Sequence, residues 1–187
     1  MATFLSCLRR ASVAGTSAEP YERRYMQSAL IFQLMVLLAV ANGTPVIAKK
    51  IFGDAFGSPL DGGSLLADGR PLFGSSKTLR GIVLAVLVAM ACSALLGLGW
   101  KPGALLGGVA MAGDLFSSFV KRRLGLPPSS MALGLDQIPE SLFPLLACRL
   151  LLPLTWLDIG VAVVLFFVGE LVLSRILFKL HVRDRPY

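Results

Sequence analysis

The feature that most constrains this chain is a series of five apolar stretches separated by shorter polar segments. They occupy 29–48, 81–98, 103–120, 138–157 and 158–180, and the second of them carries no charged residue. A helix needs about 20 mostly apolar residues to cross a bilayer. Lipid offers no partners for backbone N–H and C=O groups, so each stretch that enters the membrane is expected to be helical.

The composition supports the same interpretation. Hydrophobic residues make up 55% of the 187 positions and charged residues 16%, and the mean hydropathy is +0.74. Soluble domains average about 45–50% apolar and about 25% charged residues. The net charge of +7 would suit nucleic acid in a soluble protein, but here it fits loops that face anionic lipid and an anionic substrate. We therefore expect the lipid bilayer, and no nucleic acid, as a partner.

The domain organisation predicted from these patterns is simple. Residues 1–27 form a polar tail that is expected to be disordered, and residues 28–187 form one membrane-embedded domain. The fold class is an all-α integral membrane protein with about five transmembrane helices and two functional cytoplasmic loops. Pro139, Pro144 and Pro153 should kink or break the fourth stretch, because proline removes a backbone donor and clashes with the preceding turn.

The distribution of Lys and Arg predicts the orientation. With five spans, the loops 49–80 and 121–137 lie on the same side as the C-terminus and carry most of the basic residues outside the tail. Basic residues near span ends favour the cytoplasmic side. We expect a multi-pass protein of an inner cell membrane whose active site faces the cytoplasm.

The first long loop contains "DGRPLFGSSKTLRG" (68–81), which is close to a phosphate-binding P-loop. In the P-loop pattern G-x-x-x-x-G-K-[ST] the lysine follows the second glycine directly, whereas two serines separate Gly74 from Lys77 here. No strand is expected before it, so a nucleotide-binding α/β fold is rejected. Lys77 and Arg80 still stand at a helix start, where free N–H groups favour an anion. A flexible basic loop facing lipid headgroups is an equal alternative.

The third apolar stretch leads into a polar stripe. On a helix, Asp114, Ser117 or Ser118, and Lys121 fall on one face. An acid inside a membrane helix costs about 2.5–3.5 kcal/mol at the centre, which favours a functional role for Asp114. The alternative is a structural ion pair with Lys121 or Arg149.

Two further features extend this second loop. Arg122 and Arg123 follow Lys121, and positive-inside anchoring is their simplest explanation. In "LGLDQIPESLF" (133–143), Asp136 precedes a helix whose first turn tolerates Pro139, so an N-cap is its simplest role. Glu140 fits a first-turn partner of the helix dipole.

Together the two loops bring acids and bases to one face of a membrane. Mg²⁺ binds through one or two carboxylates plus phosphate oxygens. Phosphoryl chemistry depends mainly on positioning and charge neutralisation. This combination suits an enzyme that joins a soluble nucleotide to a membrane lipid.

Several of these motifs, in this order, resemble the CDP-archaeol synthase family. The matching segments are "ANGTPVIAKKIFG" (41–53), "SPLDGG" (58–63), "DGRPLFGSSKTLRG" (68–81), "GDLFSSFVKRRLGLPPSS" (113–130), "LDQIPESLF" (135–143) and "SRILFKLHVRDRPY" (174–187). The resemblance covers about 29–187 and leaves the tail unmatched.

The resemblance implies a Mg²⁺-dependent transfer of a cytidylyl group from CTP to a membrane lipid phosphate, giving a CDP-lipid and pyrophosphate. It implies that Asp114 and Asp136 hold Mg²⁺ and, with Lys77 and Lys121, form the catalytic set. The residues expected to bind substrate are Asn42, Asp61, Arg80, Ser117, Ser118, Arg122 and Arg123. The sequence leaves open whether the lipid is archaeol-type or another glycerol phosphate, and whether the protein is a homodimer.

Two other function classes compete. A lipid phosphatase is suggested by Ser174 and Arg175 followed by His181, but Asp184 comes one position too early and the partner PSGH motif is absent. A small transporter or scaffold would use Asp114 and Glu170 as coupling acids and the Gly103–Gly107 pair for helix packing.

Overall fold

The computed structural model describes residues 27–53, 55–127, 130 and 132–179. Within these residues the chain forms five α-helices and no sheet. The helices are α3 (Ser28–Phe52), α4 (Leu79–Leu95), α5 (Trp100–Arg123), α6 (Gln137–Cys148) and α7 (Trp156–Lys179). All of the predicted disordered tail 1–27 except Gln27 lies outside the described residues, as do the phosphatase-like His181 and Asp184.

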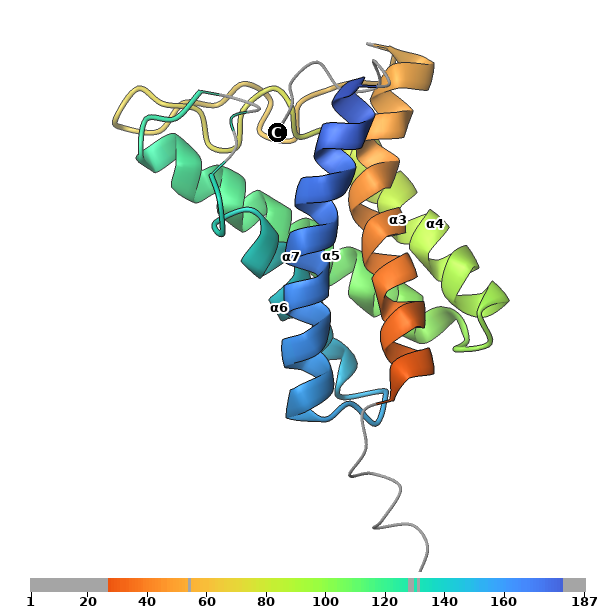
Figure 1. The fold of residues 1–187 in the computed structure, drawn as a ribbon. Coiled ribbons are helices and arrows are strands. Elements are labelled where there is room, and N and C mark those ends of the chain that lie inside the picture. The colour runs from red at the N-terminus through yellow and green to blue at the C-terminus, as the bar shows by residue number, and fades with distance from the viewer. Residues whose placement is uncertain (1–26, 54, 128–129, 131, 180–187) are drawn as a thin grey trace, which may run out of the picture.

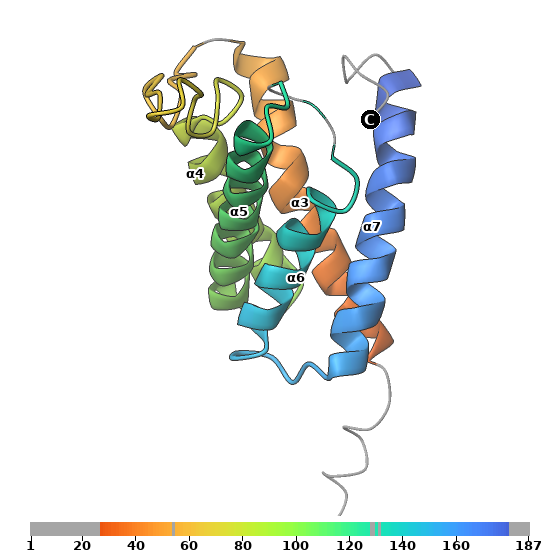
Figure 2. The same cartoon turned by 90° about the vertical axis from the view of Figure 1, so that its left-hand side faces the viewer.

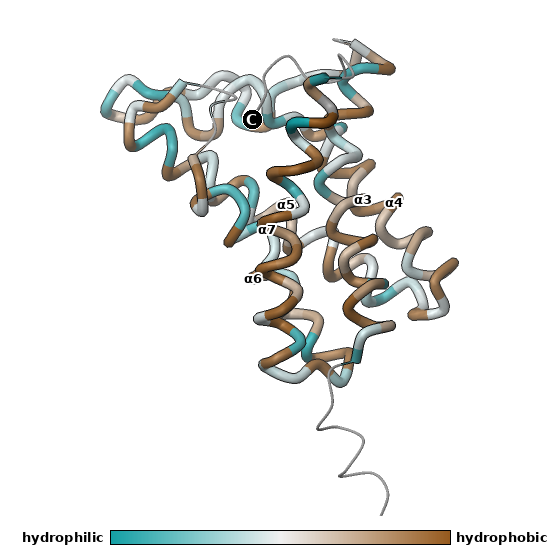
Figure 3. Tube along the Cα trace, viewed as in Figure 1, coloured by the Kyte–Doolittle hydropathy of each residue, from teal (hydrophilic) through white to brown (hydrophobic). Residues whose placement is uncertain are grey.

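The helices run up and down, so that the two long loops meet at one end of the molecule. Figure 1 and Figure 2 show the 53–78 loop, the 124–136 loop and the C-terminal end of α7 at the upper end. The start of α3, the α4–α5 turn and the α6–α7 connection lie at the opposite end. Hydrophobic residues follow the helices, and hydrophilic residues gather in the upper loops (Figure 3). The order of the spans predicted that the two long loops and the C-terminal end of the last span lie on one side, and this prediction is correct.

Three helices are long and apolar enough to cross a bilayer, namely α3, α5 and the Trp156–Ile176 part of α7. Helix α4 is apolar but has only 17 residues. The expected fourth stretch, 138–157, is not one span: α6 has 12 residues, or about 18 Å of helix. Residues 149–155 form turns and loop before α7 begins. The predicted break is correct, and the predicted extent of this helix is wrong.

Helix α3 is the centre of the bundle, and it packs against all four other helices. Its Leu34, Leu37, Leu38 and Ala41 are fully buried. Their spacing of three and four residues places them on one helix face. This stripe forms the apolar core with residues of α4–α7.

Two glycines let α4 and α5 approach closely. A Cβ atom at Gly103 would lie 2.4 Å from the carbonyl oxygen of Ala89, and one at Gly107 would lie 3.0 Å from the Ala89 Cβ. Small residues four positions apart are a common device for packing membrane helices. The Gly103–Gly107 pair therefore fixes α5, which carries the polar stripe, against α4.

The first loop is ordered by short backbone pairings. Antiparallel bridges join Pro59 to Thr78 and Leu65 to Pro71. Thr78 caps α4, and its hydroxyl accepts a hydrogen bond from the Gly81 N–H at 3.2 Å. These contacts place Lys77 directly before the first turn of α4.

Candidate active site

The first half of the site joins the 53–78 loop to the middle of α5. The Lys77 ammonium donates to both oxygens of the Asp114 carboxylate, at 2.6 and 2.5 Å. The two side chains are 22% exposed, so the pair is shielded but reachable from solution. The partner of Asp114 is thus neither Lys121 nor Arg149, which the sequence suggested as alternatives, but a lysine 37 positions away.

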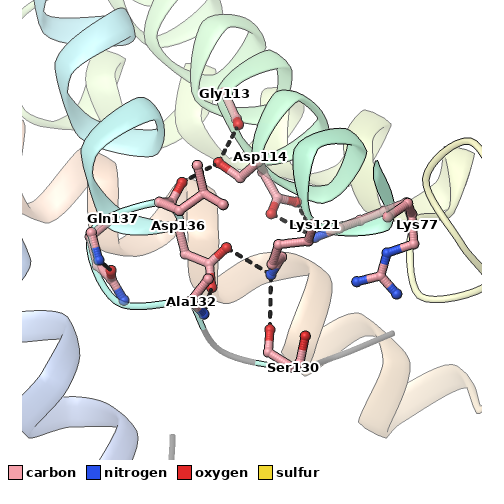
Figure 4. A network of polar contacts seen from close by, with 12 residues as sticks. Lys77, Gly113, Asp114, Lys121, Ser130, Ala132, Asp136 and Gln137 are labelled. Carbon is pink, nitrogen blue, oxygen red and sulfur yellow. Dashed lines mark hydrogen bonds and ion pairs between the residues drawn. The ribbon is translucent and has the colours of Figure 1, made fainter. Parts of the chain in front are cut away.

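The second half of the site lies about two turns further along α5, at Lys121. The Lys121 ammonium is 2.7 Å from the Asp136 carboxylate and donates to the Ser130 carbonyl at 2.9 Å. The other Asp136 oxygen accepts from the Ala132 N–H at 2.9 Å. Asp136 lies at the N-cap position of α6 but makes no side-chain capping bond there. It orders the 124–136 loop instead, and Figure 4 shows both lysine–aspartate pairs in one network.

Ser117 on α5 attaches this loop to the helix. The Ser117 hydroxyl lies 2.7 Å from the Leu135 carbonyl and 2.9 Å from the carbonyl of Gly113. Ser118 is buried. Gln137 accepts a hydrogen bond from the Gly134 N–H at 2.8 Å. The predicted stripe of Asp114, Ser117 and Lys121 therefore faces the two loops rather than lipid.

Glycine at position 113 brings α6 against the acidic part of α5. A Cβ atom there would lie 2.4 Å from the Pro139 carbonyl oxygen and 3.1 Å from the Glu140 nitrogen. Glu140 is consequently buried, with 7% of its surface exposed. Its carboxyl group is close enough to that of Asp114 for the two to interact electrostatically. Sequence reasoning treated Glu140 as a first-turn dipole partner and missed this contact.

Arg122 is the most deeply buried cation near the site, with 3% exposure. One terminal nitrogen donates to the Pro127 carbonyl at 2.9 Å. Its Nε and its other terminal nitrogen have no hydrogen-bond partner among the residues that the structure describes. Asp136 is close enough to interact with it electrostatically. Buried polar groups are nearly always paired in folded proteins, so these two donors indicate a place for an anion.

Three other arginines near the two loops, Arg70, Arg80 and Arg123, bind backbone carbonyls. Arg123 donates to Pro71 at 2.6 Å and forms a 2.5 Å ion pair with Asp68, and Arg70 donates back to the Arg123 carbonyl at 2.6 Å. Arg80 donates to the carbonyls of Gly53 and Ala55 at the end of α3. We call Arg70, Arg80 and Arg123 the arginine clamps, because they fasten the first loop to α4 and α5. Arg70 was not among the predicted site residues.

Asp61 orders the first loop from within. Its carboxylate accepts hydrogen bonds from the N–H groups of Gly63, Phe73 and Gly74 at 2.9–3.0 Å. Partial burial acts to raise the pKa of Asp61, but the donors from Phe73, Gly74 and Gly63 outweigh it and hold this pKa below its ordinary value. Asp61 thereby shapes the segment that ends in Lys77.

Asn42 lies apart from these contacts. On α3 its amide donates to the Leu38 carbonyl one turn earlier, at 3.1 Å. It is partly buried, and its predicted contact with nucleotide stays a prediction.

The donor set is compatible with a magnesium nucleotide. Among the described residues no group of three or more His, Cys, Asp or Glu side chains is arranged to hold a metal alone. Mg²⁺ in phosphoryl-transfer sites usually needs only one or two carboxylates, because the substrate phosphates supply further oxygens. Asp114 and Asp136 can meet that requirement, each beside a lysine suited to phosphate.

Comparisons with known proteins identify the family. A CDP-archaeol synthase (CarS-like) family model matches residues 89–187. The CDP-archaeol synthase of Sulfurisphaera tokodaii is 31% identical over 173 residues, which cover 87% of this chain and 97% of that protein. The enzyme of the same name from Thermococcus onnurineus is 36% identical over 143 residues, covering 71% and 79%.

A solved structure gives the same result for the fold. It is described as an intramembrane enzyme for archaeal membrane lipids biosynthesis, and it superposes with a TM-score of 0.68 at 30% sequence identity. The match covers 80% of this chain and 94% of that one. Sequence, fold and the charged network at the loop end therefore lead to one conclusion: this multi-pass membrane protein belongs to the CDP-archaeol synthase family.

Proposed function

We propose that this chain transfers the cytidylyl group of CTP to an archaeol-type glycerol phosphate at the network formed by Lys77, Asp114, Lys121 and Asp136. As a member of its family the chain is a CTP-dependent nucleotidyltransferase that makes a CDP-lipid. The observation that carries the site assignment is the convergence of two loops, with Lys77 on Asp114 at 2.5 Å and Lys121 on Asp136 at 2.7 Å.

The proposed reaction needs no protein nucleophile. A non-bridging oxygen of the lipid phosphate attacks the α-phosphorus of CTP and forms the new P–O–P bond. The bond from the α-phosphorus to the bridging oxygen of the β-phosphate breaks, and pyrophosphate leaves with the electron pair. The attacking monoester is already anionic, so catalysis consists of positioning and neutralising charge.

Basic side chains would supply that neutralisation. Lys77 and Lys121 each hold a carboxylate, and an arriving triphosphate offers them a second acidic partner. Two nitrogens of Arg122 have no hydrogen-bond partner among the described residues, which supports a phosphate contact at Arg122. A guanidinium suits this role because its donors form a rigid fork that matches phosphate oxygens.

Asp114 and Asp136 would hold Mg²⁺, which when bound supplies charge neutralisation and orientation of the phosphates. Their carboxylates are the hard oxygen donors that this ion prefers. Both lie next to lysines, so each acid stays compensated without metal.

We assign different roles to the remaining residues that were predicted to contact substrate. Ser117 and Ser118 lie on the same stripe of α5 as Asp114, and we keep them as predicted phosphate contacts. Arg80, Arg123 and Asp61 already bond loop backbone, so we propose that they act by shaping the nucleotide-binding loops. Asn42 remains a predicted nucleotide contact from α3.

We propose that the loop end faces the cytoplasm of an inner cell membrane. The first loop carries Arg70 and Lys77, and the helix ends beside the loops carry Lys49 and Lys50 on α3, Arg80 on α4, and Lys121, Arg122 and Arg123 on α5. This excess matches the positive-inside rule. A cytoplasmic site would also give CTP direct access from water.

The test is an assay of purified protein in detergent with labelled CTP, Mg²⁺ and a panel of lipid phosphates. We expect CDP-lipid and pyrophosphate in equal amounts, with the unsaturated archaeol phosphate preferred over diacyl phosphatidate. Equal or better use of the diacyl lipid would overturn the substrate proposal. Phosphate release without CTP would overturn the reaction class. Light scattering on the same preparation measures whether two copies associate.

A further inference from the structure

Arg149 lies at the end of the molecule that the reaction does not use. It stands at the C-cap of α6, where the 149–155 connection to α7 begins, and Figure 2 shows this connection at the end away from the two loops. We propose that the guanidinium of Arg149, stacked on Trp156, binds the headgroup phosphate of an anionic phospholipid in the leaflet at this end. This lipid is a ligand distinct from the lipid substrate of the reaction.

The stack leaves the hydrogen-bonding edge of Arg149 open. Its guanidinium carbon lies 4.0 Å from the centre of the Trp156 ring, which is a direct cation–π contact. Stacking uses the flat face of a guanidinium, whereas its N–H donors point outward in the plane. Arg149 is exposed, and no described residue gives its side chain a hydrogen bond or an ion pair. The fork of donors is therefore available to phosphate oxygens, whose geometry it matches.

Hydrogen bonds at the start of α7 fix the backbone beside the stack. The N–H and the hydroxyl of Thr155 donate to one oxygen of the Asp158 carboxylate, at 2.9 and 2.7 Å. The other oxygen accepts from the Gln27 N–H at 3.1 Å, and the Gln27 side chain donates to the Pro153 carbonyl at 3.0 Å. Asp158 is fully buried in these contacts. The acid nearest in sequence to Arg149 is thus already engaged and does not neutralise it.

The two tryptophans place this end of the molecule at the membrane–water interface. The chain contains only Trp100 and Trp156, which are the first residues of α5 and α7 and are both exposed. Tryptophan is enriched at the level of the lipid headgroups. The apolar part of α7 runs from Trp156 to Ile176 and has 21 residues. Its length of about 31 Å matches a hydrocarbon core of about 30 Å. Arg149, beside Trp156, therefore lies at the level of the phosphates.

Apolar side chains next to Arg149 provide a surface for lipid chains. Leu150 is 84% exposed, and Leu157 in the first turn of α7 is also exposed. A phospholipid can contact the cation and these leucines at once, which a soluble anion cannot do. A headgroup with net negative charge is favoured, because the ammonium group of a zwitterionic lipid would repel the guanidinium. The positive-inside rule gives no reason for a cation at the end opposite the basic loops, whereas a bound anionic lipid does.

The two tryptophans also supply the test. Trp100→Phe leaves Trp156 as the only tryptophan, and Trp156→Phe leaves only Trp100. Each full-length variant is reconstituted in phosphatidylcholine vesicles with a minor fraction of either phosphatidylglycerol or phosphatidylcholine brominated near the headgroup, since bromine quenches tryptophan on contact. We expect the binding constant obtained from quenching of Trp156 to be about fivefold higher for phosphatidylglycerol. No preference at Trp156, or an equal preference at Trp100, would overturn the proposal.

A second substitution in the Trp100→Phe background identifies the cation responsible. Arg149→Gln should abolish the preference for phosphatidylglycerol at Trp156. Lys101→Gln is the matched control, because Lys101 is an exposed cation at the same end of the molecule, and it should leave the preference intact. Equal losses in the two variants would show a general attraction of surface charge, and no loss in Arg149→Gln would exclude Arg149. Either result would contradict the inference.

Thermal unfolding in detergent distinguishes a lipid from free phosphate. A ligand that binds only the folded protein raises the melting temperature, here by about 2–4 °C with phosphatidylglycerol in several-fold excess over its Kd. Phosphatidylcholine and inorganic phosphate should give no rise, and an equal rise with inorganic phosphate would contradict the lipid proposal. Arg149→Gln should lose the rise. If that variant fails to fold, Trp156→Leu, which removes the ring under the guanidinium, should show a smaller rise, and a full rise would overturn the proposal.

Discussion

The arginine clamps and the lysine–aspartate network lie at the same end of the molecule and are built from similar residues, but they bind different partners. Arg70, Arg80 and Arg123 donate to backbone carbonyls, and Arg123 also pairs with the exposed Asp68. Lys77 and Lys121 pair with the shielded carboxylates of Asp114 and Asp136, and Lys121 also donates to the Ser130 carbonyl. A carbonyl that closes a loop is a permanent partner, whereas a carboxylate can exchange a lysine for a metal while the lysine takes a phosphate. We propose that residues whose main partners are loop carbonyls hold the site together, and that the lysines paired with Asp114 and Asp136 act in the reaction.

The largest effect should follow from changing the acid of the network. Asp114→Asn keeps the shape but removes the charge that pairs with Lys77 and is proposed to bind Mg²⁺. We expect kcat/KM to fall by about 10²–10³-fold, as when a preorganised charged or polar group is removed from other active sites. Turnover of labelled CTP measures this, with the melting temperature as the folding control. Undiminished turnover would remove Asp114 from the reaction.

The adjacent residues Arg122 and Arg123 provide the next test. Arg122 is a proposed phosphate contact, whereas Arg123 is one of the arginine clamps. Arg122→Lys keeps the positive charge but loses the planar fork of donors. We expect the Kd for CTP to rise about tenfold, measured by titration without lipid. An unchanged Kd would mean that the unpaired nitrogens of Arg122 do not meet the nucleotide.

Arg123→Gln should act on stability instead. It breaks the ion pair with Asp68 and the bond to the Pro71 carbonyl. We expect a loss of about 1–2 kcal/mol, the usual value for hydrogen bonds from charged donors, seen as a lower melting temperature. The Kd for CTP should stay within about threefold of wild type. A larger change in CTP affinity than in Arg122→Lys would reverse the assignment of the two residues.

Gly113 and Gly108 provide a matched comparison that tests the contact between α5 and α6. Gly113→Ala forces a methyl group against Pro139, whereas a Cβ atom at Gly108 on the same helix meets nothing within 4 Å. Overpacking costs about 1–3 kcal/mol, so Gly113→Ala should lower the melting temperature and turnover together. Gly108→Ala should change neither. Equal behaviour of the two variants would show that α6 is free to move away from α5.

The smallest expected effect is the pH dependence of the first loop. The pKa of Asp61 lies below its ordinary value of 3.8 in the folded protein. Its stabilising contribution is therefore complete above pH 3.8 and is lost as the pH falls through the lowered folded pKa. The melting-temperature difference between wild type and Asp61→Asn should be constant from pH 5 to 8 and shrink below pH 3.8. A difference that varies between pH 5 and 8 would contradict this assignment.

The sequence was sufficient for the architecture because hydrophobic length is a strong signal. The apolar stretches predicted the helices and the common side of the two loops, and the prolines predicted the break after α6. The length of α6 was not predictable, because an apolar window cannot tell a helix that crosses from one that stops and turns. Residues 149–155 are as apolar as a span, yet they include Pro153 and form no helix.

Site residues were harder to predict, because their roles depend on contacts between distant segments. Periodicity placed Asp114 and Lys121 on one helix face, but it could not identify Lys77 as the partner of Asp114. Glu140 carried no signal beyond its place in a first turn, since its burial depends on the glycine at position 113 of another helix. Arg70 was overlooked because a lone arginine in a glycine-rich loop looks like any solvated charge.

The shortness of α6 has a consequence for substrate access and product release. Its polar first turn begins well below the loop end of α5 (Figure 2), and Asp114 lies nine positions before Arg123 on α5, about 14 Å along the axis. Asp114 therefore lies deeper in the molecule than Arg123 at the loop end of α5. We therefore expect a lipid phosphate to reach Asp114 from within its leaflet with its tails in the hydrocarbon core, and pyrophosphate to leave towards water.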